Sequence, residues 1–186
     1  MVSLTSLWLP ILLSAVAVFL ASWLVHVVLT YHKADVRALP NEDQVMTAVR
    51  AGNVAPGVYV YPYCANPKEM QAPAMVEKYT KGPVGIITAL RNGPPEMGST
   101  LVQWFVYTVA VGVFVAYVAT RTIAFGAEYL GVFRIAGTIA FLTYAGAEAQ
   151  SSIWRGQPWG TTLRNSVDGL VYGLLTAGFF AWLWPR

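Results

Sequence analysis

The stretch from Leu7 to Leu29 contains no Asp, Glu, Lys or Arg. About 20 apolar residues in a helix are enough to cross the hydrocarbon core of a bilayer. No basic residue precedes Leu7, whereas a signal peptide would carry a basic region before a shorter apolar core, so we expect a retained transmembrane helix. Three later stretches have the same character, and the predicted transmembrane helices cover residues 7–29, 101–120, 129–147 and 167–184.

These segments predict an all-α integral membrane protein, a four-helix bundle that forms a single membrane domain over residues 1–186. Hydrophobic residues make up 56% of the chain and charged residues only 11%, against roughly 25% charged residues in soluble domains. The net charge is +3, but the basic residues do not cluster on one soluble face, which argues against a nucleic-acid partner. The single cysteine, Cys64, excludes an internal disulfide and any Cys-based metal motif, and an unpaired thiol is typical of a reducing compartment.

The Lys and Arg residues are divided unequally between the two sides that four helices would create. Most of them lie in the segment 31–100 and in the turn 150–166. The opposite side has Arg121 and Arg186, with Arg134 near the edge of its helix. The positive-inside rule therefore predicts that both termini are outside and that the segment 31–100 and the turn are cytoplasmic.

Small residues recur at every fourth position on two of the predicted helices. They are Thr108, Gly112, Ala116 and Thr120 on the second helix and Gly169, Gly173, Ala177 and Ala181 on the fourth. Stripes of small residues let helix backbones approach closely where no hydrophobic effect drives them together. We expect these two faces to hold the bundle together or to mediate dimerisation.

The segment 31–100 is charged and rich in Pro and Gly, and it predicts a small mixed α/β cap on the cytoplasmic side. Asn41, with Gln44 at the capping-box position, and Asn66, followed by Pro, are candidate helix N-caps. β-branched and aromatic residues indicate two strands that pair. The predicted helices begin after Asn41, after Asn66 and at Pro73, with ends at Gly52 and Gly82 for the first and last, and the predicted strands cover residues 58–61 and 84–90.

A two-stranded sheet alone is marginally stable in water, so we expect the cap to lean on the membrane surface or on the helix ends. Its tyrosines suit that setting, because their rings favour the apolar boundary and their hydroxyls favour water. Either they anchor the cap, which we prefer, or they form a recognition surface for lipid or a partner chain. They are Tyr59, Tyr61, Tyr63 and Tyr79.

Few polar residues lie inside or at the ends of the predicted helices, and such residues are functional hypotheses by default. In the predicted orientation each helix contributes one of them near the cytoplasmic side. On the first helix we further expect a polar stripe of Ser22, His26, Thr30 and Lys33. The candidate polar site consists of His26, Gln103, Glu148 and Asp168, together with Arg155 of the adjoining turn.

A histidine with two carboxylates is suited to a proton relay, an acid–base pair or part of a metal site, with Gln103, His32 or water as a further ligand. The chain contains none of the common catalytic or phosphate-binding motifs, and we predict no metal or cofactor. Structural explanations compete with each functional one. Asn165 as an N-cap would place Asp168 at a favourable position of the helix dipole, and Arg155 or Arg164 would neutralise Glu148.

Arg134 lies on the opposite side of the predicted bundle. At 100° per residue it shares one line of the third helix with Thr138, Phe141, Ala145 and Glu148, so we expect this face to point into the bundle. Glu128 or a snorkelling side chain would satisfy Arg134 locally. The alternative is that Arg134 and Glu148 mark the two mouths of one polar path.

The turn between the third and fourth helices reads Ser-Ile-Trp-Arg-Gly-Gln-Pro-Trp, and the chain closes with Ala-Trp-Leu-Trp-Pro before its last residue. With its apolar flanks this pattern resembles small four-helix bacterial membrane proteins classed as a domain of unknown function. The resemblance covers the helices and implies a bundle in the bacterial inner membrane. It implies no activity, and the long segment 31–100 departs from it.

Three functions remain open on these observations. The preferred one is a non-catalytic accessory or oligomeric membrane subunit whose cap binds lipid or a partner. Its expected partners are membrane lipids and a second copy of the chain or a larger membrane complex. The alternatives are a small transporter or proton path through His26, Glu148 and Asp168, and an interfacial enzyme that modifies lipids.

Overall fold

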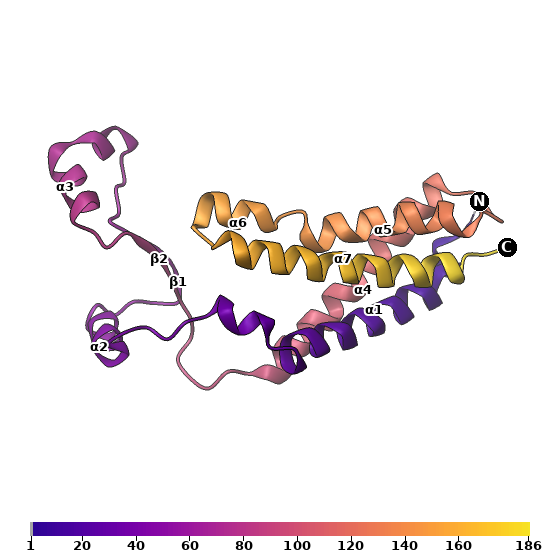
Figure 1. Cartoon of the computed structure of the whole chain (residues 1–186), viewed down its shortest axis with the longest axis horizontal. Helices are drawn as coiled ribbons and strands as arrows, with labels where there is room; N and C mark the ends of the chain where they lie inside the picture. The colour runs from indigo at the N-terminus through magenta and orange to yellow at the C-terminus, as the bar shows by residue number, and fades with distance from the viewer. Residues whose placement is uncertain (1) are drawn as a thin grey trace. The chain divides into compact units, whose positions relative to one another are not determined.

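The computed structural model describes residues 2–186 and divides them into two compact units (Figure 1). The helical unit consists of residues 2–37 and 96–186, and the loop unit consists of residues 38–95. The boundary differs from the predicted cap of residues 31–100, because residues 31–37 belong to the helical unit. The 3₁₀ turn Tyr31–Asp35 is therefore part of the helical unit.

The helical unit is built from long, mostly apolar helices. Its helices are α1 (Trp8–Trp23), α4 (Met97–Thr122), α5 (Tyr129–Ala145), α6 (Glu148–Arg155) and α7 (Trp159–Trp182). A 3₁₀ turn, Leu4–Leu7, precedes α1, and a π-helical turn, Leu24–Val28, continues it. Three continuous helical stretches are long and apolar enough to cross a membrane: Leu4–Val28, Met97–Thr122 and Tyr129–Arg155. The fourth predicted span, on α7, does not reach the same apolar character because its first half is polar.

The helices pack along their length, and both chain termini lie at the same end of the helical unit (Figure 1). The most buried side chains come from every long helix, and they are Leu7, Val18, Val111, Val115, Val132 and Phe180. The last residues close this end, because the Trp184 indole donates to the Ala124 carbonyl at 2.9 Å and the Gly126 amide donates to the Pro185 carbonyl at 3.0 Å. An apolar core therefore joins the start of α1 to the end of α7.

The predicted small-residue stripe of the fourth helix packs directly against α5. A Cβ atom at Gly169 would lie 2.7 Å from the Cβ of Ala145, and one at Gly173 would lie 3.1 Å from the amide nitrogen of Phe141. On α4, Gly112 meets Ile11 of α1 in the same way, with 3.1 Å to its Cγ2. Both stripes hold the bundle together, since only residues without a Cβ allow these backbones so close.

Three helix boundaries were predicted wrongly. The second helix begins at Met97 rather than after Gly98-Ser99-Thr100, and it continues past Arg121 to Thr122. The last helix begins at Trp159, so Asn165 is not an N-cap and Asp168 lies in the third turn rather than at the helix start. The predicted turn of residues 150–166 is mostly helical, because α6 extends to Arg155 and ends at Gly156, whose φ is +70°.

The predicted inward face of the third helix is formed only in part. Arg134 and Thr138 are exposed, whereas Ala145 is buried and, like Phe141, lies against the glycines of α7. The fully buried residues Val132, Ala136 and Ala140 lie on another line of the helix. Because Arg134 is exposed, the packing of α5 does not support a polar path through the bundle that opens at Arg134 and at Glu148.

The loop unit follows the sequence prediction closely. Its elements are α2 (Glu42–Ala51), β1 (Gly57–Tyr61), a 3₁₀ turn (Pro67–Gln71), α3 (Pro73–Lys81) and β2 (Gly85–Ala89). The strands pair antiparallel, with Tyr59 opposite Ile87. Asn66 caps its turn by accepting from the Lys68 amide at 3.1 Å, but Asn41 has a φ of 56° and makes no capping bond with its side chain, so the predicted capping box is not formed.

Candidate functional site

One face of the first turns of α7 carries a ladder of polar side chains. Thr161, Arg164 and Asp168 are three and four residues apart, a spacing that places them one above another on a helix. Asp168 is buried, with a side chain only 5% exposed. An ionisable group this deeply buried requires partners, and they come from a distant part of the chain.

The partners lie on the 3₁₀ turn Tyr31–Asp35, which packs against α7. The carboxylate of Asp35 accepts from Thr161 Oγ1 at 2.7 Å and from Arg164 Nε at 2.9 Å, and Arg164 Nη2 donates to the same oxygen. The hydrogen-bonded Arg164 guanidinium holds the pKa of the Asp35 carboxyl well below its usual range, despite the opposing effect of burial. Asp35 is therefore an ionised anchor of this turn.

His32 and Tyr31 of the same turn reach Asp168. His32 lies between two carboxylates, with Nδ1 2.6 Å from Asp35 Oδ2 and Nε2 2.7 Å from Asp168 Oδ2. The Tyr31 hydroxyl donates to the other carboxylate oxygen, Asp168 Oδ1. Burial, reinforced by the bond to Asp168, raises the pKa of the Tyr31 hydroxyl, which keeps it a neutral donor.

His26 joins this cluster from the π-helical turn that follows α1. Its Nδ1 lies 3.0 Å from the carbonyl oxygen of Ser22, and its ring stacks on His32 with centroids 4.5 Å apart. The predicted polar stripe of the first helix ends at His26. The i→i+5 bond from the Leu29 amide to the Leu24 carbonyl changes the helical period, and Leu29 has an extended backbone. Thr30 and Lys33 therefore do not continue the face of Ser22 and His26.

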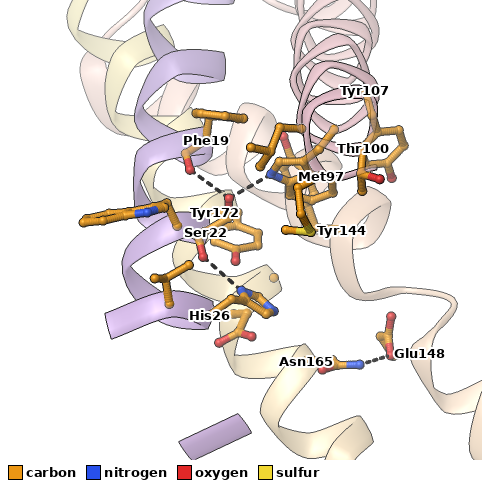
Figure 2. A pocket seen from close by; sticks show the side chains of 16 residues that line it. Phe19, Ser22, His26, Met97, Thr100, Tyr107, Tyr144, Glu148, Asn165 and Tyr172 are labelled. Atoms are coloured by element: carbon orange, nitrogen blue, oxygen red, sulfur yellow. Dashed lines mark hydrogen bonds between the residues drawn. The ribbon is translucent and has the colours of Figure 1, made fainter. Parts of the chain in front are cut away.

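A pocket of about 580 Å³ opens beside His26, between α1, α4, α5 and α7. Its polar end carries His26 and Asp168, with the Asn165 amide donating to Glu148 Oε2 at 2.7 Å (Figure 2). Large apolar side chains that are 43–67% exposed surround its mouth: Trp23, Val27, Met97 and Leu101. No Lys or Arg lines it among the residues that the structure describes.

Aromatic rings form the inner wall of the pocket. Tyr172 packs edge-on against Trp104 and Tyr144, with ring centroids 6.2 and 5.5 Å away, and Tyr107 stacks on Trp104 at 5.5 Å. The Trp104 indole donates to Ser22 Oγ at 2.8 Å (Figure 2). The Tyr172 hydroxyl, in contrast, is buried and has no hydrogen-bond partner among residues 2–186. A buried donor without an acceptor is costly, and Tyr172 is one of the residues that line a space large enough for a ligand.

The structure brings together some of the predicted site residues and separates others. His26, Glu148 and Asp168 all line the pocket. Gln103 is exposed and is not among the residues that line it. Arg155 is exposed at the end of α6. Glu148 is bonded to Asn165 rather than to Arg164, whose guanidinium pairs with Asp35.

Several residues of the site were missed by the sequence analysis. Tyr31 and Asp35 were assigned to a peripheral cap, and His32 was considered only as a further ligand. Two signals were present: the three-residue spacing of His32 and Asp35, and the ladder on α7. The aromatic wall gave no signal, because tyrosine and tryptophan are common in membrane helices near the interface.

Comparisons with protein-family models, with curated proteins and with solved structures found no match. The resemblance to four-helix bacterial membrane proteins therefore remains a prediction. The site itself is a cluster of two imidazoles and two carboxylates at the polar end of an aromatic pocket.

Proposed function

We propose that the protein is a four-helix membrane protein that binds an amphipathic ligand in the pocket beside His26, in a non-catalytic role. The observation that carries this proposal is the division of the pocket into an aromatic wall and a polar end. A volume of about 580 Å³ lies within the range of roughly 300–1,000 Å³ that is typical of small-molecule sites. The apolar part of a ligand would lie against the rings, and its head group would lie beside His26 and Asp168 and accept a hydrogen bond from the Tyr172 hydroxyl.

The packing of α7 supports the inclusion of this helix among the spans. It lies against α5, with Gly169 and Gly173 in close contact, and the two termini are at one end of the helical unit (Figure 1). A chain whose ends share one side of a membrane crosses it an even number of times. The polar face at the start of α7 is covered by Tyr31, His32 and Asp35, which lowers the cost of placing it near the bilayer.

The charge of the polar end selects the class of head group. Glu148 and Asp168 are acidic, and the described lining contains no Lys or Arg. An anionic head group would be repelled by these carboxylates, whereas a neutral hydroxyl-bearing or cationic one would not. The exposed apolar side chains at the mouth, Trp23, Val27, Met97 and Leu101, are suited to admitting an acyl chain from the surrounding lipid.

Photolabelling in proteoliposomes tests this proposal with a photoactivatable long-chain monoacylglycerol. The informative variant is Tyr172→Phe, because the Tyr172 hydroxyl has no hydrogen-bond partner in the part of the chain that the structure describes, and its removal breaks no hydrogen bond there. Loss of one hydrogen bond of about 0.5–1.5 kcal/mol to the ligand lowers labelling at subsaturating probe by about 2- to 12-fold. The matched control is Tyr117→Phe, an exposed α4 tyrosine outside the pocket lining.

We expect the label on peptides from α1, α4 and α7 that line the pocket, with an unlabelled monoacylglycerol as competitor. Equal labelling of wild type and Tyr172→Phe, or label spread over all exposed helix faces, would contradict the proposal. The accessory or oligomeric role is tested separately by crosslinking in native membranes. A protein that is monomeric and partnerless there would not have that role.

A proton path is the second candidate, favoured by one specific observation. His26, His32 and Asp168 each offer a nitrogen or oxygen atom within 4.8 Å of the others, which is close enough for proton exchange through one water. In proteoliposomes, His26→Ala and Glu148→Gln should then abolish a measured proton flux. Flux that is unchanged in both variants would remove this candidate.

A further inference from the structure

The two histidines of the chain meet in one place. The full sequence contains only His26 and His32, and the structure brings them together with Asp168, one ligand atom from each lying within 4.8 Å of the others. They come from the end of α1, from the following 3₁₀ turn and from α7. The convergence of both histidines on a buried carboxylate requires a physical explanation.

The hydrogen bonds around His32 determine which nitrogen faces Asp168. Its Nδ1 lies 2.6 Å from Asp35 Oδ2, and Asp35 is itself held by Arg164 and Thr161. A carboxylate bound to one imidazole nitrogen fixes the orientation of the ring, as it does for metal-bound histidines. The Nε2 atom of His32 is thereby directed at Asp168 Oδ2, 2.7 Å away. Two lone pairs at that distance repel each other unless a proton or a metal cation lies between them.

In His26 and Asp168 too, hydrogen bonds restrain one atom of the side chain and leave another available as a ligand. The Ser22 carbonyl oxygen can only accept, so His26 Nδ1 carries the hydrogen and Nε2 carries the lone pair. Tyr31 donates to Asp168 Oδ1, which leaves Oδ2 for a cation. Each of the three side chains therefore has one atom restrained by the protein and one atom available as a ligand. This pattern of supported ligands is typical of metal sites.

We propose that His26, His32 and Asp168 bind a divalent transition metal ion of the zinc class. Two imidazole nitrogens with one carboxylate oxygen suit zinc, whereas magnesium and calcium prefer oxygen ligands alone. Three protein ligands leave a fourth position open, and because His26 and Asp168 line the pocket, this position is accessible to water or to a ligand there. A bound metal ion would take the place of the hydrogen bond between His32 Nε2 and Asp168 Oδ2.

Metal binding needs a small rearrangement of His26, and His32 Nε2 must also move away from Asp168 Oδ2, which is now 2.7 Å away. Bonds of about 2.0–2.1 Å in a tetrahedral site place ligand atoms about 3.3 Å apart, closer than the 4.8 Å limit of the cluster. The His26 and His32 rings are stacked, with an interplanar angle of 8°, so one ring must tilt for both lone pairs to converge. His26 is the ring that can move, because it is exposed to the pocket and its one side-chain hydrogen bond is to Ser22.

Calorimetric titration of the chelator-stripped, detergent-solubilised protein with ZnCl₂ tests this proposal. We expect one zinc ion per chain, and His26→Gln should weaken the affinity by about 100-fold or more. His26→Gln removes a ligand but leaves the His32, Asp35 and Arg164 bonds in place, so the variant keeps its fold. The matched control is Cys64→Ser, since Cys64 lies in the loop unit and its zinc affinity should equal that of the wild type.

Cobalt provides a second measurement. Co²⁺ in a four-coordinate site with nitrogen and oxygen ligands has intense visible absorption, which should develop in the wild type and disappear in His26→Gln. Wild-type protein without a saturable heat at one ion per chain, or equal affinities for wild type and His26→Gln, would overturn the proposal. The titration contains no amphiphilic probe and the photolabelling is repeated with a chelator, so failure of the metal site and failure of the ligand pocket are distinguishable.

Discussion

At the scale of single residues, Asp35 connects the two sides of the candidate site. Its carboxylate accepts from Thr161 and Arg164 of α7 and faces Nδ1 of His32, so it attaches the 3₁₀ turn to α7 and orients the imidazole. Its side chain is 12% exposed. Desolvation alone would favour the neutral acid, yet the guanidinium and the hydroxyl together keep it ionised.

The stability of the protein should depend on Asp35 at acidic pH. The pKa of Asp35 is lower in the folded protein than in the unfolded chain, where it is about 3.9. A lowered pKa contributes stability that is fully present above the unfolded value and is lost as the pH falls toward the folded value. We therefore expect the apparent unfolding temperature of the metal-free wild type to fall between pH 5 and pH 3 more steeply than that of Asp35→Asn, which starts lower at pH 7.

Thermal unfolding in detergent with a chelator, measured by circular dichroism at several pH values, checks this expectation. The control is Asp43→Asn, an exposed carboxylate in the first turn of α2. In this control, the apparent unfolding temperature should fall between pH 5 and pH 3 as steeply as it does in the wild type. Parallel pH curves for wild type and Asp35→Asn would show that Asp35 does not carry this contribution.

At the scale of the elements, the α5–α7 pair depends on glycines at the contact. Gly169 and Gly173 lie where a Cβ would meet Ala145 or Phe141, partly at backbone atoms that cannot rotate away. The same helix has another glycine, Gly178, at which an added Cβ would meet nothing within 4 Å among the described residues. One helix thus contains both the test positions and their control.

Alanine at these glycines should have opposite effects. Gly169→Ala is expected to destabilise the helical unit by about 1–3 kcal/mol, because overpacking forces the helices apart. Gly178→Ala should be neutral or stabilise by up to about 1 kcal/mol, since alanine is the better helix former and the site is open. Equilibrium unfolding of both variants in the same detergent measures the difference. Equal effects of the two substitutions would indicate that the close contact does not determine the stability.

At the scale of the whole molecule, the helical unit has two chemically different ends. The termini and the α4–α5 connection lie at one end, joined by the Trp184 and Pro185 bonds. The pocket and the histidine cluster lie where α1 ends, α4 begins and α6 meets α7. If the proposed membrane insertion and orientation hold, the pocket is at the cytoplasmic side and the termini are outside.

Single-cysteine labelling in intact cells tests this orientation. In a Cys64→Ser background, a membrane-impermeant maleimide should label Phe125→Cys and Arg186→Cys, because their neighbours Gly126 and Pro185 are hydrogen-bonded to each other. Lys78→Cys and Arg155→Cys should react only after the cells are permeabilised. The reverse result would invert the orientation. Labelling of Phe125→Cys and Arg155→Cys from the same side would mean that α5 does not cross the membrane.

Much of the fold follows from local sequence. Apolar runs of about 20 residues predict membrane-spanning helices, because that length is enough to cross the bilayer core. The four-residue spacing of Gly169 and Gly173 predicts a close helix contact before the partner helix is known. The strand pair of the loop unit was also predictable from its β-branched and aromatic residues. The start of α7 was not, since Asn165 has the local preferences of an N-cap but lies inside a helix whose first turns are stabilised by Asp35.

By itself, then, the sequence determined the apolar helices, their small-residue faces and the presence of His26 and Asp168 among polar residues near one end. Only the tertiary structure decided that His32 and Asp35 turn back to meet α7, that Gln103 points away, and that Tyr172 lines a pocket. The physical reason is the range of the interactions. Hydropathy and helix spacing act within a few turns, whereas His32 and Asp168 are 136 residues apart in the chain. Their contact depends on the π-helical turn after α1 and on the start of α7 at Trp159.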